Sequence, residues 1–153
     1  MALALVLALL WRRPALLGQV LIADLAADGL AYVLKQSIDR PRPPEVYRTP
    51  RPLVHVPHEG SFPSGHAATA FACATLLSWW APRYTPAFAL LAVAIGFSRV
   101  YVGVHWPLDV LGGALLGVAT ATLLVLVTRR WRLGAEADCA RSTATERGAP
   151  PAR

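Results

Sequence analysis

Four long apolar stretches alternate with polar segments along the chain and decide its fold class. They are Ala15–Leu34, His66–Trp80, Pro86–Val104 and Pro107–Val127. The first holds 20 residues, and a helix rising about 1.5 Å per residue would carry it across roughly 30 Å, the thickness of a bilayer's hydrocarbon core. Because the stretches lack the alternation of barrel strands, they predict an all-α, multi-pass transmembrane helix bundle with about four full spans.

A fifth apolar stretch, Met1–Leu10, is too short to cross a membrane and would cover about 15 Å as a helix. We therefore expect a truncated N-terminal span beside the full ones. The basic residues Arg12 and Arg13 follow this stretch, whereas a signal peptide carries its basic residues before the apolar run.

Two polar segments complete the organisation. The segment Lys35–Pro63 holds seven of the 13 prolines, which block helix formation, so it is expected to be a loop. The end of the chain is basic and rich in Ala, Arg, Ser, Thr and Pro. The expected domains are a membrane domain over residues 1–128 and a basic, disordered cytoplasmic tail over residues 129–153.

The amino-acid composition indicates which classes of partner the protein has. The chain is 55% hydrophobic and 16% charged, more apolar than an ordinary soluble domain. Its formal net charge of +6, in so apolar a chain, favours a lipid bilayer and a phosphate-bearing partner over nucleic acid. The two cysteines, Cys73 in an apolar run and Cys139 in the tail, predict neither a disulfide nor a metal ligand.

Hairpin connections between the spans would gather the polar groups on one membrane face. That face receives Lys35, His66, Ser98, Arg99, His105 and Asp109. The opposite face receives Arg83 and the basic run Arg129–Arg132, and the positive-inside rule makes it cytoplasmic. The sequence thus predicts a protein of the cell membrane with its polar cluster on the extracytoplasmic face.

Several of these polar residues suit an anion. Lys35, Arg42 and Arg99 bring three positive charges, and guanidinium groups match phosphate oxygens in pairs. Ser64 and Gly65 stand where a loop turns into a helix, whose first N–H groups face an anion.

Histidines supply the reactive groups. His105 and Asp109 are four residues apart, and Pro107 favours a helix start between them, so the carboxylate can orient the imidazole. His66 supplies a second imidazole that can act as an acid. Together with the cations, these residues suggest phosphoryl transfer without a metal or any other cofactor.

In order and spacing, these residues resemble the signature of the type 2 phosphatidic acid phosphatase superfamily, which includes undecaprenyl diphosphate phosphatases, phosphatidylglycerophosphate phosphatases and vanadium haloperoxidases. The resemblance covers roughly Leu21–Val127. It implies that His105 forms a phosphohistidine, that Asp109 orients it and that His66 protonates the leaving oxygen. The phosphate-binding residues that it implies are Lys35, Arg42, Ser64, Gly65 and Arg99. Membrane members of the family usually have six spans, more than are predicted here.

The predicted function is a membrane phosphatase for a lipid phosphomonoester or diphosphate, of the undecaprenyl diphosphate, phosphatidic acid or phosphatidylglycerophosphate class. One alternative is a haloperoxidase-like oxidoreductase that holds vanadate, although such members are soluble. The other is a non-catalytic membrane phosphate-binding protein, which intact His105, His66 and Asp109 disfavour.

Other polar and small residues have structural interpretations. Asp24 and Asp28 share a helix stripe with Lys35 and should face the bundle interior, either in an interhelical hydrogen bond or in a polar track towards the site. His55 and His58 match no motif position and are taken as structural or substrate-facing.

A stripe of small residues on the last span, Gly113, Gly117 and Ala121, predicts close helix packing within the protomer. The run Arg129–Arg132 is interpreted as a topology anchor that binds anionic headgroups.

Overall fold

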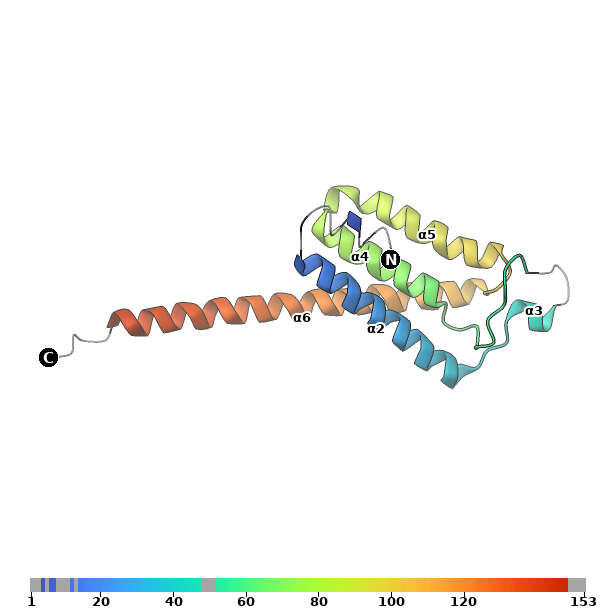
Figure 1. Ribbon diagram of the computed structural model, residues 1–153, viewed down its shortest axis with the longest axis horizontal. Coiled ribbons are helices and arrows are strands. Elements are labelled where there is room, and N and C mark those ends of the chain that lie inside the picture. The colour runs from blue at the N-terminus through green and yellow to red at the C-terminus, as the bar shows by residue number, and fades with distance from the viewer. Residues whose placement is uncertain (1–3, 5, 8–11, 13, 48–51, 149–153) are drawn as a thin grey trace.

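The computed structural model describes residues 4, 6, 7, 12, 14–47 and 52–148, with side chains as far as residue 130. The elements within these ranges are helices, which confirms the predicted all-α class. Most of the expected short span Met1–Leu10 lies outside the described residues. The elements in Figure 1 are α2 (Pro14–Ile38), α3 (Pro43–Val46), α4 (Gly65–Trp80), the 3-10 helix η1 (Pro82–Tyr84), α5 (Thr85–Tyr101) and α6 (Pro107–Gly148).

Helix α4 forms the centre of the bundle and packs against α2, α5 and α6. Small side chains fill the core between these helices, at Ala23, Ala27, Ala31, Ala67, Ala68 and Ala72. Large apolar side chains point outward instead, and Leu25, Leu90 and Leu115 are each at least 70% exposed. This arrangement suits lipid, because small residues let helices approach closely while acyl chains surround the large ones.

Two glycines set the contact between α4 and α6. A Cβ atom at Gly117 would collide with the backbone of Ala68, and one at Gly113 would collide with the carbonyl oxygen of Ser64. Ala121, one turn further along α6, is fully buried. The prediction that this small-residue stripe packs within the protomer is therefore confirmed.

Three helical segments are long and apolar enough to cross a membrane: Pro14–Val46, Pro82–Tyr101 and Pro107–Arg130. They correspond to three of the four expected full spans. The fourth, His66–Trp80, falls on α4, which has 16 residues and so a length of about 24 Å. Helix α4 is thus the short, central member of the bundle.

Helix α6 continues beyond the expected domain boundary and ends at Gly148. Its apolar segment ends at Arg130, close to the boundary expected after residue 128, and the rest extends away from the bundle in Figure 1. The residues after Arg130 include many helix formers and no proline before Pro150, which favours continuation of the helix. The division into a membrane domain and a tail stays a prediction.

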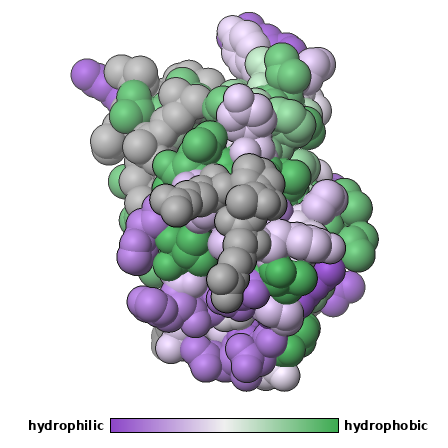
Figure 2. All heavy atoms as spheres, turned by 90° about the vertical axis from the view of Figure 1, so that its right-hand side faces the viewer, coloured by the Kyte–Doolittle hydropathy of each residue, from purple (hydrophilic) through white to green (hydrophobic). Residues whose placement is uncertain are grey.

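The helix ends that carry the polar residues meet at one end of the bundle. Helix α2 extends four residues beyond Leu34 and ends where Asp39, with a φ of 41°, donates its N–H to the carbonyl oxygen of Lys35. The end of α5 and the starts of α3, α4 and α6 lie at the same end, on the right of Figure 1. Figure 2 views this end and shows hydrophilic residues spread over it among hydrophobic ones.

Candidate active site

Each predicted site residue lies at a helix end or in an adjoining loop. Lys35 is in the last turn of α2, and Arg42 is the residue immediately before α3. Ser64 precedes α4, which begins with Gly65 and His66. Arg99 is in the last turn of α5, His105 precedes α6 and Asp109 is in the first turn of α6.

His105 and Asp109 form a buried pair. The Nδ1 atom of His105 lies 3.6 Å from Oδ2 of Asp109, and the side chains are 5% and 0% exposed. Oδ2 of Asp109 accepts a hydrogen bond from the backbone N–H of Trp106 at 2.9 Å. That bond fixes the carboxylate at the start of α6, so that the imidazole faces it across the turn that Pro107 begins.

Arg42 lies against the other side of the imidazole. Its Nη1 atom is 3.4 Å from Nε2 of His105. Because a guanidinium group only donates, Nε2 is the acceptor here and a neutral ring carries its proton on Nδ1, towards Asp109. The Nδ1 atom has no hydrogen-bond partner among the described residues, and a movement of a few tenths of an ångström would bring Asp109 within reach.

Arg42 also has a structural role, and its side chain is buried, with 1% of its surface exposed. Its Nε atom donates to the carbonyl oxygen of Glu59 at 2.9 Å, and Nη2 donates to that of Gly60 at 3.3 Å. Its Nη1 atom donates to the carbonyl oxygen of Val104 at 3.0 Å. The guanidinium therefore ties the loop before α4 to the loop before α6, in addition to lying beside His105.

Arg40, which the sequence analysis did not single out, binds the remaining oxygen of Asp109. Its Nη1 atom donates to Oδ1 at 2.8 Å, and its guanidinium lies 5.8 Å from the ring centre of Trp106. Two signals could have identified it. Asp109 needs a cationic partner if it is buried, and Arg40 stands two residues before Arg42, a spacing that points side chains the same way in an extended segment.

Ser64 joins the start of α4 to the start of α6. Its backbone N–H donates to the carbonyl oxygen of Asp109 at 2.9 Å, and its Oγ accepts from the N–H of Ala67 at 3.5 Å. A Cβ atom at Gly65 would lie 3.1 Å from Oδ1 of Asp28. Asp28, expected in the bundle interior, is exposed and reaches the start of α4, while Asp24 is partly buried.

His66 is exposed at the same end of the bundle. The side chains of Arg99, His105 and Lys35 lie near enough to its ring for their charges to act on it. Lys35 donates from Nζ to Oε2 of Glu59 at 3.1 Å, and Nε of Arg99 donates to Oγ of Ser98 at 3.1 Å. The two histidines and the predicted cations thus lie together.

The two loop histidines contact each other. The rings of His55 and His58 meet edge to face, with centroids 6.2 Å apart. Over the ranges that the structure describes, no group of three His, Cys, Asp or Glu residues is placed to hold a metal ion. The positive charge at the site comes from Arg and Lys side chains.

Comparison with known proteins identifies the family of this chain. Residues 15–133 match the model of the PAP2 superfamily. An undecaprenyl-diphosphatase of Sulfolobus acidocaldarius is 36% identical over 113 residues, which are 72% of this chain and 55% of that protein. The chain spans about half the length, or less, of this and two further curated relatives that it matches.

Two solved structures share the fold. The crystal structure of LpxE from Aquifex aeolicus is 33% identical, has a TM-score of 0.72 and matches 79% of this chain and 73% of that one. A transmembrane PAP2-type phosphatidylglycerolphosphate phosphatase from Bacillus subtilis is 34% identical, with a TM-score of 0.60, over 72% of this chain and 58% of that one. With its helices of membrane-spanning length and its match over residues 15–133, this chain belongs to the PAP2 superfamily.

Proposed function

We propose that this protein is a membrane phosphatase that removes the terminal phosphate from a lipid phosphomonoester or diphosphate. The observation that carries the proposal is the buried pair of His105 and Asp109, with Arg42 against Nε2 of the imidazole and an exposed His66 nearby. A nucleophile, an orienting carboxylate, an acid and a cation are the groups that metal-independent phosphoryl transfer needs.

The proposed reaction has two steps. Nε2 of His105 attacks phosphorus, the N–P bond forms, and the P–O bond to the lipid breaks as the leaving oxygen takes a proton from His66. Water then attacks the phosphohistidine and gives a proton to the neutral His66. The N–P bond breaks, and inorganic phosphate leaves with His105 restored.

The surrounding groups have distinct roles in this proposal. Asp109 holds the proton-bearing Nδ1 of His105 and stabilises the ring as it becomes cationic. Arg40 is a positioning residue that holds Asp109 through Oδ1. The phosphate oxygens are received by Arg99, Lys35 and the turn at Ser64 and Gly65. Arg42 joins them when its Nη1 atom, which now lies beside Nε2 of His105, turns to the incoming phosphate. Glu59 is exposed, so an incoming phosphate can replace its carboxylate at Lys35.

The proposed substrate class is supported by the surface of the bundle and by the relatives. Large apolar side chains cover the outside of the bundle, so a lipid tail can stay in the bilayer while its headgroup enters the charged end. Similarity to an undecaprenyl-diphosphatase and to a phosphatidylglycerolphosphate phosphatase supports a lipid phosphate. We place the site on the extracytoplasmic face of the cell membrane, on the basis of the positive-inside rule.

Purified full-length protein in detergent, given undecaprenyl diphosphate, phosphatidic acid and phosphatidylglycerophosphate in turn, tests the proposal by release of inorganic phosphate. We expect release from at least one lipid, loss of release in His105→Ala, and near wild-type release in His55→Ala, a matched histidine change outside the motifs. Acid-labile labelling from a radioactive substrate should appear in the wild type and be absent in His105→Ala. Unchanged turnover in His105→Ala would overturn the assignment of the nucleophile.

A further inference from the structure

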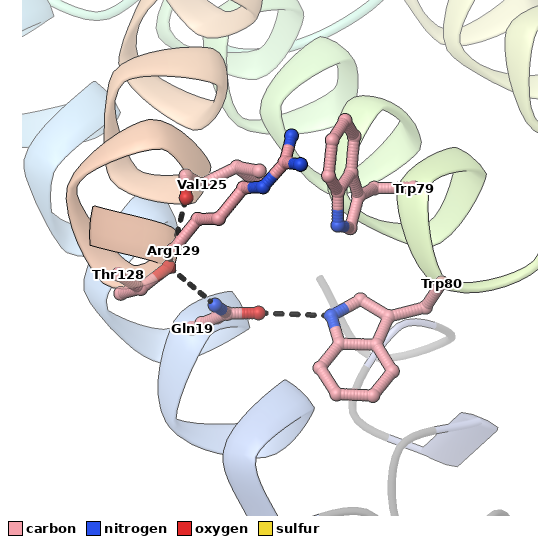
Figure 3. Close-up of a pocket in the computed structure, with 6 residues that line it drawn as sticks. All are labelled: Gln19, Trp79, Trp80, Val125, Thr128 and Arg129. Carbon is pink, nitrogen blue, oxygen red and sulfur yellow. Dashed lines mark hydrogen bonds between the residues drawn. The ribbon is translucent and has the colours of Figure 1, made fainter. Parts of the chain in front are cut away.

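The end of the bundle opposite the candidate active site holds a cavity of about 340 Å³, within the size range of ligand sites. It lies where α2 begins, where α4 ends and where the apolar segment of α6 ends. The residues that line it, drawn in Figure 3, are Gln19, Trp79, Trp80, Val125, Thr128 and Arg129.

A chain of hydrogen bonds fixes one wall of this cavity. Nε1 of Trp80 donates to Oε1 of Gln19 at 2.8 Å, and Nε2 of Gln19 lies 3.0 Å from Oγ1 of Thr128. Oγ1 of Thr128 in turn donates to the carbonyl oxygen of Leu124 at 2.8 Å. The chain connects α4, α2 and α6, and it occupies the amide and hydroxyl groups, so the wall is formed before any ligand arrives.

Arg129 and Trp79 provide the other side. Figure 3 shows the Arg129 side chain extending across the cavity towards Trp79. Both side chains are exposed, and within the part of the chain whose side chains are described no carboxylate pairs with Arg129. Among the described side chains, the cavity therefore offers a guanidinium group without a carboxylate partner, two indole rings and the apolar surface of Val125.

The level of the cavity in the membrane indicates which ligand would fill it. Arg129 is the next-to-last residue of a membrane-spanning segment that ends at Arg130, and Trp side chains favour the headgroup level of a bilayer. A guanidinium group pairs with phosphate through two N–H groups, and a negatively charged ligand would compensate its charge. Glycerophospholipids present a phosphate at this depth together with an acyl chain that can follow Trp79 and Val125.

We propose that this cavity is a binding site for the phosphate of an anionic glycerophospholipid, with Arg129 as its principal ligand. Bound lipid would hold the ends of α2, α4 and α6 together and so stabilise the folded bundle by mass action. This site is separate from the candidate active site and does not depend on phosphatase activity.

Arg130 offers a matched control, because it is the neighbouring exposed base on the same helix and does not line the cavity. Full-length protein in neutral detergent would be titrated with dihexanoyl phosphatidylglycerol, dihexanoyl phosphatidylcholine or inorganic phosphate, and its thermal unfolding midpoint followed. We expect phosphatidylglycerol to raise the midpoint saturably in the wild type and in Arg130→Gln. Arg129→Gln should weaken this apparent affinity about tenfold or more, the effect of losing a charged hydrogen-bonded pair.

The arms of the experiment separate the sources of phosphate. Equal stabilisation of Arg129→Gln and Arg130→Gln by phosphatidylglycerol would overturn the proposal, because binding would then be unspecific or elsewhere. Equal stabilisation by inorganic phosphate that depends on Arg129 would overturn the lipid as ligand. If Arg129→Gln is poorly folded without lipid, Arg129→Lys replaces it, because lysine keeps the positive charge and lacks the paired N–H groups of the guanidinium. We expect the affinity of Arg129→Lys for phosphatidylglycerol to lie below that of the wild type.

Discussion

Replacing Arg40 by Gln would remove the guanidinium that donates to Oδ1 of Asp109 at 2.8 Å. The carboxylate is fully buried, whereas the Arg40 side chain is 33% exposed. A hydrogen bond to a charged group contributes about 1.5–3 kcal/mol, and partial exposure of Arg40 favours the lower end of that range. A loss of about 1.5 kcal/mol in the transition state corresponds to a rate about tenfold lower.

The change should appear in kcat rather than in KM. Arg40 acts on Asp109, and Asp109 on the imidazole, so the expected defect is poorer orientation and poorer stabilisation of the cationic ring during attack. Phosphate release would be measured over a range of lipid concentrations for the wild type, Arg40→Gln and Arg40→Lys. We expect Arg40→Lys to recover part of the rate, because an ammonium group can still donate to Oδ1.

A double-mutant cycle tests whether Arg40 works through Asp109. Asp109→Asn alone should lower kcat strongly, and adding Arg40→Gln to it should cost little more, because the interaction has already been removed. Fully additive effects of the two changes would refute the reasoning. A rise in KM with kcat unchanged would instead make Arg40 a direct ligand of the phosphate.

Three further predictions concern the cofactor, the packing and the topology. Activity should survive EDTA and be inhibited by vanadate, because Arg and Lys side chains supply the charge; loss in EDTA that a divalent ion restores would contradict this. Gly117→Ala should lower the free energy of unfolding by about 1–3 kcal/mol, because the new Cβ meets the Ala68 backbone. Gly29→Ala, whose new Cβ would have nothing within 4 Å, should be neutral or slightly stabilising. Denaturation of the two variants side by side checks this, and equal midpoints would contradict it. Reporter fusions after Arg130 and within the loop before α4 should report the cytoplasm and the exterior, and an exported C-terminal reporter would reverse the assignment.

The membrane bundle could be predicted from the sequence because hydrophobic length is a direct requirement of the bilayer. Backbone groups in lipid must bond within their own segment, so long apolar runs have few alternatives to helices. The sequence also predicted that Lys35, His66, Arg99 and His105 lie at one end of the bundle, because successive membrane spans alternate in direction. Helix ends were less well predicted, and α2 passes Leu34 to reach Ile38 because polar side chains are tolerated in its last turn.

The contacts made by Arg40 and Arg42 could not be predicted in the same way. Both lie in a proline-rich segment without helical or strand periodicity, so nothing in the pattern says where the chain turns. Arg42 was expected to bind phosphate, and in the structure its guanidinium donates to carbonyl oxygens of two loops. Such a role depends on loops that are distant in sequence, at residues 59–60 and 104, coming together in space.

The position of the reactive pair is set by the packing of α4 on α6 as much as by the loops. Ser64 donates its backbone N–H to the carbonyl oxygen of Asp109, and Gly113, one turn further along α6, lets the carbonyl oxygen of the same Ser64 approach closely. These two contacts bind the start of α4 to the first turns of α6. Because Asp109 faces His105 from that first turn, a larger residue at position 113 would displace the carboxylate together with the helix. The small-residue stripe that suits a membrane bundle therefore also fixes the geometry of the candidate active site.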